Sequence, residues 1–140
     1  FSKAYGLAGL RIGYSAMHPE LAGWINRIRL PFNTSLLAQV AAIAALDDQD
    51  YLAKSRKNNQ EGYTQLTQGM IALGRNLIPS FGNFFCVEVG DASVVNQGLL
   101  HQGVIVRPVA NYGLPHHLRV SIGTFEENKR FLEALKGVVK

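Results

Sequence analysis

The sequence predicts an α/β protein in which a few strands are covered by helices, over roughly residues 48–140. Three observations support this fold class. The run Asn83–Val89 is apolar and has strong β-propensity. Shorter apolar runs at 104–107 and 118–122 predict two further strands. Helical patterns at 92–101 and after Thr124 alternate with these strands.

The segment before residue 48 is expected to hold one short strand and two helices. Residues 10–15 read as a strand that returns from a glycine-rich turn. Pro19 and Glu20 suit the first turn of a helix, which should end before Pro31. Its apolar positions fall at helical spacing and predict one buried face, made of Leu21, Trp24, Ile25 and Ile28.

A second helix is predicted from Leu36 to Leu46, after the cap-forming residues Asn33, Thr34 and Ser35. This helix is alanine-rich and apolar on nearly all sides. Such a helix is normally buried, either in a core or against a partner subunit.

A long helix is expected to connect the two parts of the chain, from Tyr51 to about Leu77, after a cap at residues 47–50. It is mostly polar, and its glycines weaken it. The residues expected to point inward are Tyr51, Leu52, Tyr63, Leu66, Met70, Ile71 and Leu73.

The last part of the chain carries clear helix boundaries. The helix at 92–101 should be closed by Gly103. Thr124 and Glu127 have the spacing of a capping box and should begin the final helix. The buried stripe of that helix is predicted to be Phe131, Leu132, Leu135, Val138 and Val139.

Composition narrows the class of protein. The 140 residues are 47% hydrophobic and 17% charged, which is ordinary for a globular domain with a core. The net charge of +4 is spread along the chain, and its densest cluster, at residues 54–57, is typical of a solvated helix face, so no nucleic-acid partner is expected. No apolar run approaches the length of a membrane span, and nothing resembles a signal peptide. The single Cys86 lies in an apolar run and favours a buried, inert thiol in a reducing, cytoplasmic compartment.

The first fourteen residues carry the strongest chemical pattern. Lys3 follows Ser2, glycines stand at positions 6, 9 and 13, and Arg11 lies eight residues after the lysine. A lysine amine forms imines with carbonyl compounds, and a guanidinium offers a planar fork of donors that matches phosphate oxygens. The pattern suits a covalent lysine beside a phosphate-binding arginine, but these features taken separately are also typical of a surface lysine and an ordinary glycine-rich turn.

This run, Ser-Lys-Ala-Tyr-Gly-Leu-Ala-Gly-Leu-Arg-Ile-Gly-Tyr, resembles the cofactor-lysine motif of fold type I pyridoxal-phosphate-dependent aminotransferases, class I/II. It is most similar to that of the histidinol-phosphate aminotransferases. The resemblance continues through Arg107-Pro108 and Leu118–Thr124, and so covers essentially the whole chain. It implies that pyridoxal 5'-phosphate is the cofactor, that Lys3 is the catalytic residue, and that Ser2, Lys3 and Arg11 bind the cofactor.

Arg107 and Arg119 are a second group of candidate site residues, because each lies in an otherwise apolar predicted strand. A charge in such a strand needs a partner, because burial without one is costly. For Arg107 and Arg119, the residues alone favour a salt bridge or exposure to water at a strand end. The resemblance instead implies that both bind substrate, through its carboxylate or phosphate group.

The resemblance also implies a domain organisation. Residues 1–47 would be the C-terminal remnant of a large cofactor-binding domain, and residues 48–140 a small α/β domain. The chain would then be the C-terminal portion of a longer, homodimeric protein, and inactive by itself. The implied reaction is transamination of histidinol phosphate with 2-oxoglutarate, giving imidazole acetol phosphate and glutamate, in histidine biosynthesis. The alternatives are an aromatic aminotransferase, a threonine-phosphate decarboxylase, or a non-catalytic regulatory relative.

The remaining polar candidates are weaker. His116 and His117 are adjacent and lack the spacing of a metal site, so they are expected to be loop residues and no metal is predicted. Tyr5 and Tyr14 are compatible with packing or with the cofactor site. Asn83 resembles the asparagine that opens the first strand of the small domain in this family.

Overall fold

The computed structural model describes residues 1–139 and divides into two compact units, Phe1–Arg56 and Lys57–Lys140. The division falls inside the longest helix, α3 (Gln49–Ala72), so residues of that helix belong to both units. The predicted domain boundary at residues 47–48 refers to a larger protein and stays a prediction.

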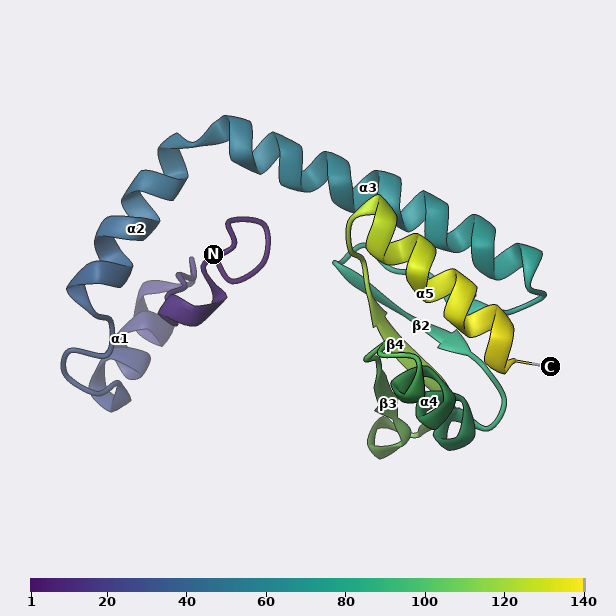
Figure 1. The fold of residues 1–140 in the computed structure, drawn as a ribbon. Helices are drawn as coiled ribbons and strands as arrows, with labels where there is room; N and C mark the ends of the chain where they lie inside the picture. Colours follow the sequence, from purple (N-terminus) through teal and green to yellow (C-terminus); the bar gives the residue numbers. More distant parts are fainter. Residues whose placement is uncertain (140) are drawn as a thin grey trace. The chain divides into compact units, whose positions relative to one another are not determined.

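The first unit contains a short 3₁₀ helix and two α-helices before α3: η1 (Ala8–Leu10), α1 (Pro19–Ile28) and α2 (Leu36–Asp47) (Figure 1). Each α-helix begins at a side-chain cap. Nδ1 of His18 accepts from the amide of Glu20, and the Ser35 hydroxyl accepts from the amide of Ala38 at 3.1 Å. Since a cap satisfies amides that have no partner within the helix, it fixes where the helix starts. The predicted starts of both helices are confirmed.

The strand predicted at residues 10–15 is wrong. Leu10 ends η1, Arg11 adopts a left-handed conformation with φ +52°, and residues 12–18 have no regular structure. A strand needs a hydrogen-bonded neighbour, and among residues 1–139 none pairs with this segment. Local β-propensity therefore could not produce a strand here.

Helix α2 is apolar as predicted, but the first unit buries little of it. Only Ala38 and Ala42 are buried. Its large side chains are exposed, namely Leu36, Leu37, Val40, Ile43 and Leu46. The predicted apolar face of α1 is likewise exposed. The expectation that these faces are buried is not met by the residues described.

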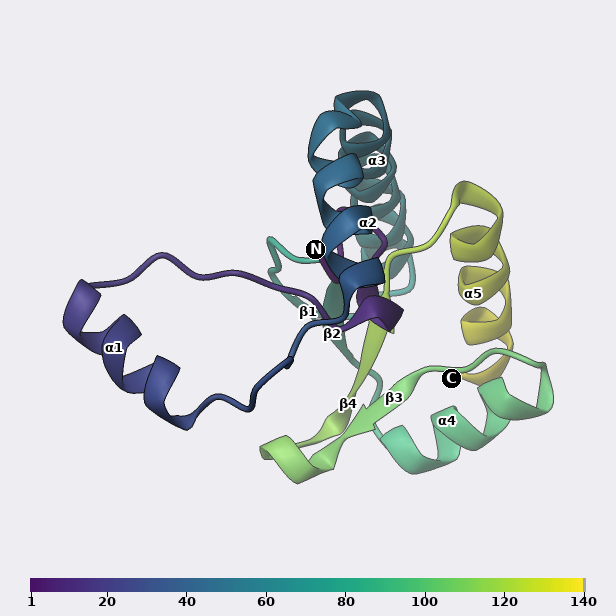
Figure 2. The same ribbon diagram turned by 90° about the vertical axis from the view of Figure 1, so that its left-hand side faces the viewer.

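The second unit is a four-stranded antiparallel sheet with helices against it (Figures 1 and 2). The strand order is β1-β2-β4-β3. The strands are β1 (Leu77–Ile78), β2 (Phe84–Glu88), β3 (Arg107–Val109) and β4 (Leu114–Ser121). The helices are α4 (Ala92–His101) and α5 (Phe125–Val138), together with the part of α3 that follows Arg56. The α/β fold class predicted for this part of the chain is confirmed.

Three predicted boundaries in the second unit need correction. Helix α3 ends at Ala72 rather than near Leu77, because Gly74 turns the chain with φ +64° and Leu77–Ile78 pair with β2. Strand β3 begins at Arg107 rather than at Val104, whose amide is bonded to the carbonyl of Leu99 in the turn after α4. Strand β4 begins at Leu114, four residues before the predicted start.

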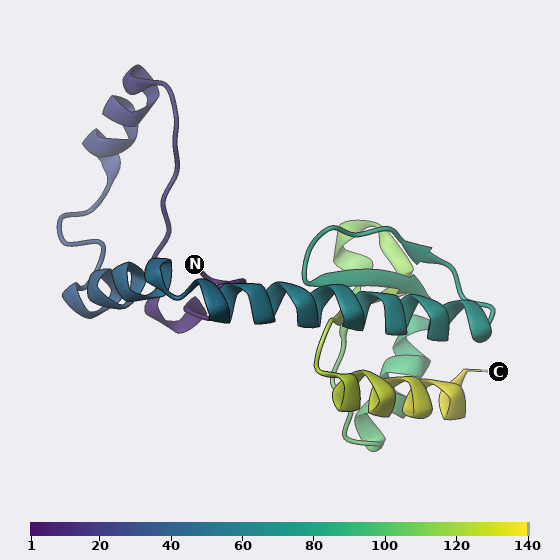
Figure 3. The ribbon, with the colours of Figure 1, turned by 90° about the horizontal axis from the view of Figure 1, so that it is seen from above.

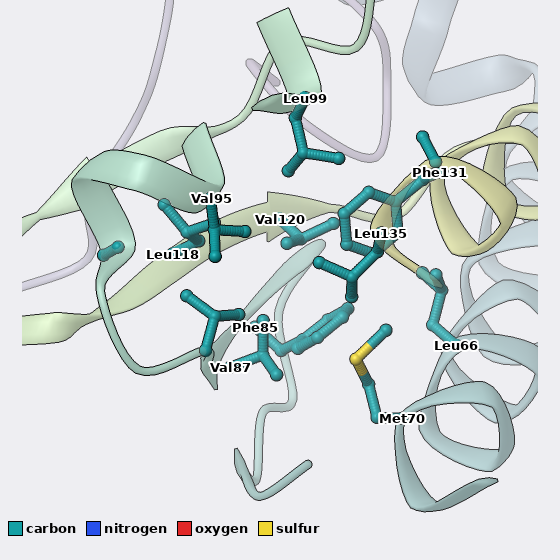
Figure 4. Close-up of a cluster of buried hydrophobic side chains, with 13 residues drawn as sticks. Leu66, Met70, Phe85, Val87, Val95, Leu99, Leu118, Val120, Phe131 and Leu135 are labelled. Carbon is teal, nitrogen blue, oxygen red and sulfur yellow. The ribbon is translucent and has the colours of Figure 1, made fainter. Parts of the chain in front are cut away.

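One face of the sheet and all three helices form a single hydrophobic core. Phe85 and Val87 of β2 and Leu118 and Val120 of β4 point into it. Figure 4 shows side chains of α3, α4 and α5 converging on these strand residues. The helix residues are Leu66, Met70, Val95, Leu99, Phe131 and Leu135. Figure 3 shows α3 and α5 running beside one another in the second unit. Because successive strand residues point to opposite faces, Cys86 of β2 and Arg119 of β4 lie on the other face.

The junction between β4 and α5 is fixed by the predicted capping box. The amide of Thr124 donates to Oε2 of Glu127 at 2.8 Å, and the Thr124 hydroxyl accepts from the amide of Glu127. Replacing Thr124 with alanine should remove this cap and lower the free energy of unfolding by about 1 kcal/mol. Chemical denaturation would measure this loss. Replacement of Thr64, an exposed threonine inside α3, by alanine is the control and should change the stability little.

The same capping box predicts a dependence of stability on pH. Hydrogen bonds from the backbone amide and then from the hydroxyl of Thr124 lower the pKa of Glu127 below its ordinary value. A carboxyl group with a lowered pKa stabilises the fold above its unfolded pKa, and this stability is lost as the pH falls through the folded pKa. Melting temperatures measured from neutral pH to pH 3 should fall less steeply for Glu127→Gln than for wild type. Parallel curves would contradict the assignment.

No helix among residues 1–139 is both long and apolar enough to span a membrane.

Candidate functional site

The first seven residues form a closed loop that exposes Lys3. The amide of Gly6 donates to the Lys3 carbonyl at 2.9 Å, and the amide of Leu7 donates to the Phe1 carbonyl at 3.1 Å. The Lys3 side chain is exposed, whereas Ser2 is half-buried. The backbone of Lys3 is therefore held while its amine remains free to react.

Gly6 is required at its position in this loop. Its φ is +69°, a region in which residues with a Cβ are strained. A Cβ there would also lie 2.7 Å from the hydroxyl oxygen of Tyr51. The glycine allows the turn after Lys3 to pack closely against the start of α3.

Arg11 follows η1 and is held by it. Its φ of +52° is uncommon for a residue other than glycine. In this conformation its Nη1 donates to the Ala8 carbonyl at 2.6 Å, so one donor of the guanidinium is used locally. The other donors have no hydrogen-bond partner among the described residues and remain available for an anion.

Ser2, Lys3 and Arg11 thus lie on one short segment of the first unit, in which hydrogen bonds hold the backbone of Lys3 and the guanidinium of Arg11. No hydrogen bond or ion pair links the three among residues 1–139. Together they offer a hydroxyl, an amine and a guanidinium, which are groups that can bind phosphate oxygens and react with a carbonyl carbon.

Arg107 and Arg119 lie directly opposite one another in the sheet. They are paired residues of the edge strand β3 and of β4. Because Leu118 and Val120 point into the core, Arg119 and its partner Arg107 point to the other face. Like charges placed opposite one another on a sheet destabilise it. The fold therefore brings together the two arginines that the sequence singled out, at some cost in stability.

Neither arginine has a carboxylate partner in the part of the chain that the structure describes. Within residues 1–139 no Asp or Glu oxygen lies within 4 Å of either guanidinium, so the salt bridges favoured by the residues alone are not formed. The Nε atom of Arg119 is buried and has no hydrogen-bond partner. The contacts that these guanidiniums do make are with aromatic rings. Arg119 lies over Phe84, 4.9 Å from the ring centroid, and Arg107 over Tyr112 at 5.9 Å.

Cys86 is the cross-strand neighbour of Arg119 on the same face of the sheet. It is half-buried rather than fully buried. Burial raises the pKa of its thiol, and the positive charge of Arg119 partly offsets that rise. The raised pKa keeps the thiol protonated and unreactive at neutral pH.

His116 and His117 lie in β4, so their prediction as loop residues is wrong. Nδ1 of His116 lies 2.9 Å from the carbonyl oxygen of Gly90, which ties β4 to the turn before α4. His117 is paired with Glu88 across the sheet. Among the described residues, no group of three or more His, Cys, Asp or Glu side chains could hold a metal ion.

The remaining candidates have structural contacts. The rings of Tyr5 and Tyr14 lie 5.2 Å and 5.9 Å from the ring of Phe1. The carbonyl of Asn83 accepts from the amide of Ile122, which extends the pairing of β2 with β4. A separate hollow of about 380 Å³ lies near the end of β4, between residues 103–106 and α5, and neither paired arginine lines it.

Phe84 and Tyr112 were not identified from the sequence as site residues. In the sequence, Phe84 is one apolar residue of the predicted strand at 83–89, and no pattern marks Tyr112. Their role depends on which strand residues face one another, and that pairing is visible only in the folded sheet. One signal was available in the sequence. Side chains alternate between the two faces of a strand, so Phe84 and Cys86 must share the face opposite Phe85.

Comparison with known proteins gives one consistent result. The chain is 59% identical to histidinol-phosphate aminotransferase 2 of Pseudomonas fluorescens and 58% identical to that of Pseudomonas aeruginosa, in each case over 99% of the chain. Its structure superposes on the histidinol-phosphate aminotransferase of Sinorhizobium meliloti, in complex with pyridoxal-5'-phosphate, with a TM-score of 0.87 and 36% identity over 99% of the chain.

These matches cover only part of the relatives. The chain spans 38% of the length of the two Pseudomonas proteins and 39% of the Sinorhizobium chain. The family model described as aminotransferase class I and II matches residues 1–135, which is nearly the whole chain. The chain therefore belongs to the class I and II aminotransferase family.

Proposed function

We propose that the full-length protein is a pyridoxal-phosphate-dependent aminotransferase of histidine biosynthesis. It would transfer the amino group between histidinol phosphate and 2-oxoglutarate, giving imidazole acetol phosphate and glutamate. The identity of 58–59% to two histidinol-phosphate aminotransferases over the whole chain supports this assignment. Because the chain spans 38% of those proteins, the assignment also depends on residues outside it.

The first segment of the chain fits the proposed cofactor. Pyridoxal phosphate has an aldehyde, which calls for an amine, and a phosphate, which calls for hydroxyl and guanidinium donors. The exposed Lys3 supplies the amine, and Ser2 with the free donors of Arg11 would hold the phosphate. When bound, the cofactor supplies an electron sink for the pair of electrons left when a C–H bond of the substrate breaks.

Lys3 would move the proton in this reaction. Its Nζ would take the proton from the substrate carbon that carries the amino group and return it to the aldehyde carbon of the cofactor. This task needs a side chain that can approach and leave the reacting carbon. The exposed Lys3 side chain, on a backbone fixed by the Gly6 hydrogen bond, meets this requirement.

Arg107 and Arg119 would bind the anionic groups of the substrates, and this pair is the observation that carries the substrate proposal. Two guanidiniums opposite one another, with no carboxylate partner among the described residues, form a site of concentrated positive charge. A phosphate dianion can accept from both forks, which suits histidinol phosphate. The same pair can bind the carboxylates of glutamate and 2-oxoglutarate in the other half of the reaction.

An assay of the purified full-length protein with pyridoxal phosphate tests the proposal. Formation of glutamate from 2-oxoglutarate should depend on histidinol phosphate and should be much slower with phenylalanine or tyrosine. Preferred use of the aromatic amino acids would indicate an aromatic aminotransferase. Release of CO₂ from threonine phosphate would indicate a decarboxylase, and binding of the cofactor without turnover of any substrate would indicate a regulatory relative.

The proposal extends to assembly and location. The exposed large side chains of α2 support a homodimer, since a helix that is apolar on nearly all sides is normally covered. Light scattering should give twice the mass of the full-length chain. A single cysteine, which cannot form a disulfide within this chain, agrees with a cytoplasmic location. The proposed division into a large-domain remnant at 1–47 and a small domain at 48–140 belongs to the same assignment.

A further inference from the structure

Arg119 reaches its place on the sheet without a polar contact that would orient its guanidinium. Its Nε is buried and unpaired, and within residues 1–139 no carboxylate or carbonyl oxygen bonds to its terminal nitrogens. An arginine side chain has several rotatable bonds, so a guanidinium with no partner samples many orientations. An arginine with a mobile guanidinium must give up this conformational freedom when it binds an anion. The lost entropy weakens binding.

The guanidinium of Arg119 is restricted by its contact with the ring of Phe84. Phe84 pairs with Ser121 across the β2–β4 ladder, and Arg119 stands two residues before Ser121. The two side chains are therefore diagonal neighbours on one face of the sheet, within reach of one another. The central carbon of the guanidinium lies 4.9 Å from the ring centroid, well inside the range of a cation–π contact.

We propose that Phe84 is a positioning residue that holds Arg119 ready for the anionic group of the substrate. The ring lies against the guanidinium, and the two terminal nitrogens, which have no hydrogen-bond partner among residues 1–139, remain available for a carboxylate or phosphate. This inference rests on the proposed function of Arg119 as a substrate-binding residue. It adds a residue that touches neither substrate nor cofactor and acts only through Arg119.

The second arginine provides an internal comparison. Arg107 lies over Tyr112, but at 5.9 Å, close to the limit of about 6 Å for such contacts. Tyr112 is also 64% exposed, compared with 39% for Phe84. Water weakens a cation–π contact, so Tyr112 should hold Arg107 less firmly than Phe84 holds Arg119. Replacement of Phe84 should therefore have the larger effect.

The test uses the full-length protein loaded with pyridoxal phosphate and compares Phe84→Leu with Phe84→Trp. Leucine keeps an apolar side chain in the strand but has no ring, whereas tryptophan keeps the ring face. Phe84→Leu should raise the KM for 2-oxoglutarate about three- to twentyfold and leave kcat within about twofold of wild type. Phe84→Trp should restore a KM near the wild-type value. The matched control is Phe81→Leu, because Phe81 is fully exposed three residues earlier and its ring contacts no arginine among residues 1–139.

Calorimetry with glutarate separates this inference from the proposed function. Glutarate has the two carboxylates of the substrate and cannot react. Phe84→Leu should bind it about three- to twentyfold more weakly than wild type, and Phe81→Leu as tightly as wild type. If the wild type transaminates no substrate but shows this pattern, the proposed function fails and the positioning role stands. If the wild type transaminates while Phe84→Leu keeps its KM and its glutarate affinity, the positioning role is overturned alone. It is also overturned if Phe84→Trp behaves like Phe84→Leu, or if wild type does not bind glutarate.

Discussion

Replacing Lys3 with alanine is expected to reduce the turnover of the full-length enzyme by at least about a thousandfold. The proposed mechanism gives this one amine two tasks, the covalent link to the cofactor and the transfer of the proton. No other lysine lies in the first fourteen residues, so nothing in that segment can replace it. The measurement is kcat for transamination of histidinol phosphate under saturating cofactor.

The fold should tolerate this change. Lys3 is exposed and its side chain makes no hydrogen bond or ion pair among the described residues, so the free energy of unfolding should change by no more than about 0.5 kcal/mol. Lys54→Ala, at an exposed position of α3, is the matched control and should leave both quantities unchanged. A Lys3→Ala enzyme that keeps more than a few per cent of wild-type kcat would show that Lys3 is not the catalytic residue.

Replacing Arg119 with alanine is expected to lower kcat/KM by about a hundredfold for both histidinol phosphate and 2-oxoglutarate. The loss should lie mainly in KM, because Arg119 is proposed to bind the anionic groups that both substrates share. Arg119→Lys should recover only part of the loss, since an ammonium keeps the charge but lacks the planar fork of donors. Steady-state kinetics with each substrate varied in turn would measure these effects.

The stability of the same variant decides between a binding role and a structural role for Arg119. Within residues 1–139 the arginine has no carboxylate partner, and it faces a like charge at Arg107, so its removal should cost at most about 1 kcal/mol of unfolding free energy. Arg56→Ala, at an exposed position of α3, serves as the control. A large loss of stability with unchanged KM would mean that Arg119 serves the sheet rather than the substrate.

Most of the second unit could be predicted from its sequence because its signals are local. Helix α4 occupies the predicted residues, and the capping box of Thr124 and Glu127 begins α5 as expected. The stripe of α5 packs on the core, with Phe131 and Leu135 buried. In each case the residues that decide the structure lie within a few positions of one another, so no distant partner is needed.

The errors in the fold occurred where a distant partner decides. Residues 10–15 have the composition of a strand but no neighbour to pair with, and β4 begins early because residues from Leu114 onward pair with β3 and β2. Leu77 lies in β1 rather than in α3 because it pairs with Val87 of β2. Similarly, the sequence predicts that the apolar surface of α2 is buried, but the described residues leave most of it exposed.

In the candidate site too, the features set by neighbouring residues could be predicted, and those set by distant strands could not. Lys3 and Arg11 belong to a continuous motif, whereas Arg107 and Arg119 stand out as charges in apolar strands, and only the family resemblance implies that they bind substrate. The sequence could not show that these two arginines face one another, that no described carboxylate pairs with them, or that Phe84 lies against Arg119. Each of these facts depends on the register of strands that are separated in the sequence.

Chemical trapping of the cofactor on Lys3 tests the central claim most directly. The full-length protein would be incubated with pyridoxal phosphate, reduced with borohydride, digested, and mapped by mass spectrometry. A phosphopyridoxyl group is expected on Lys3 alone, with other exposed lysines such as Lys54 unmodified. The absence of an adduct on Lys3, or adducts spread evenly over the surface lysines, would contradict it.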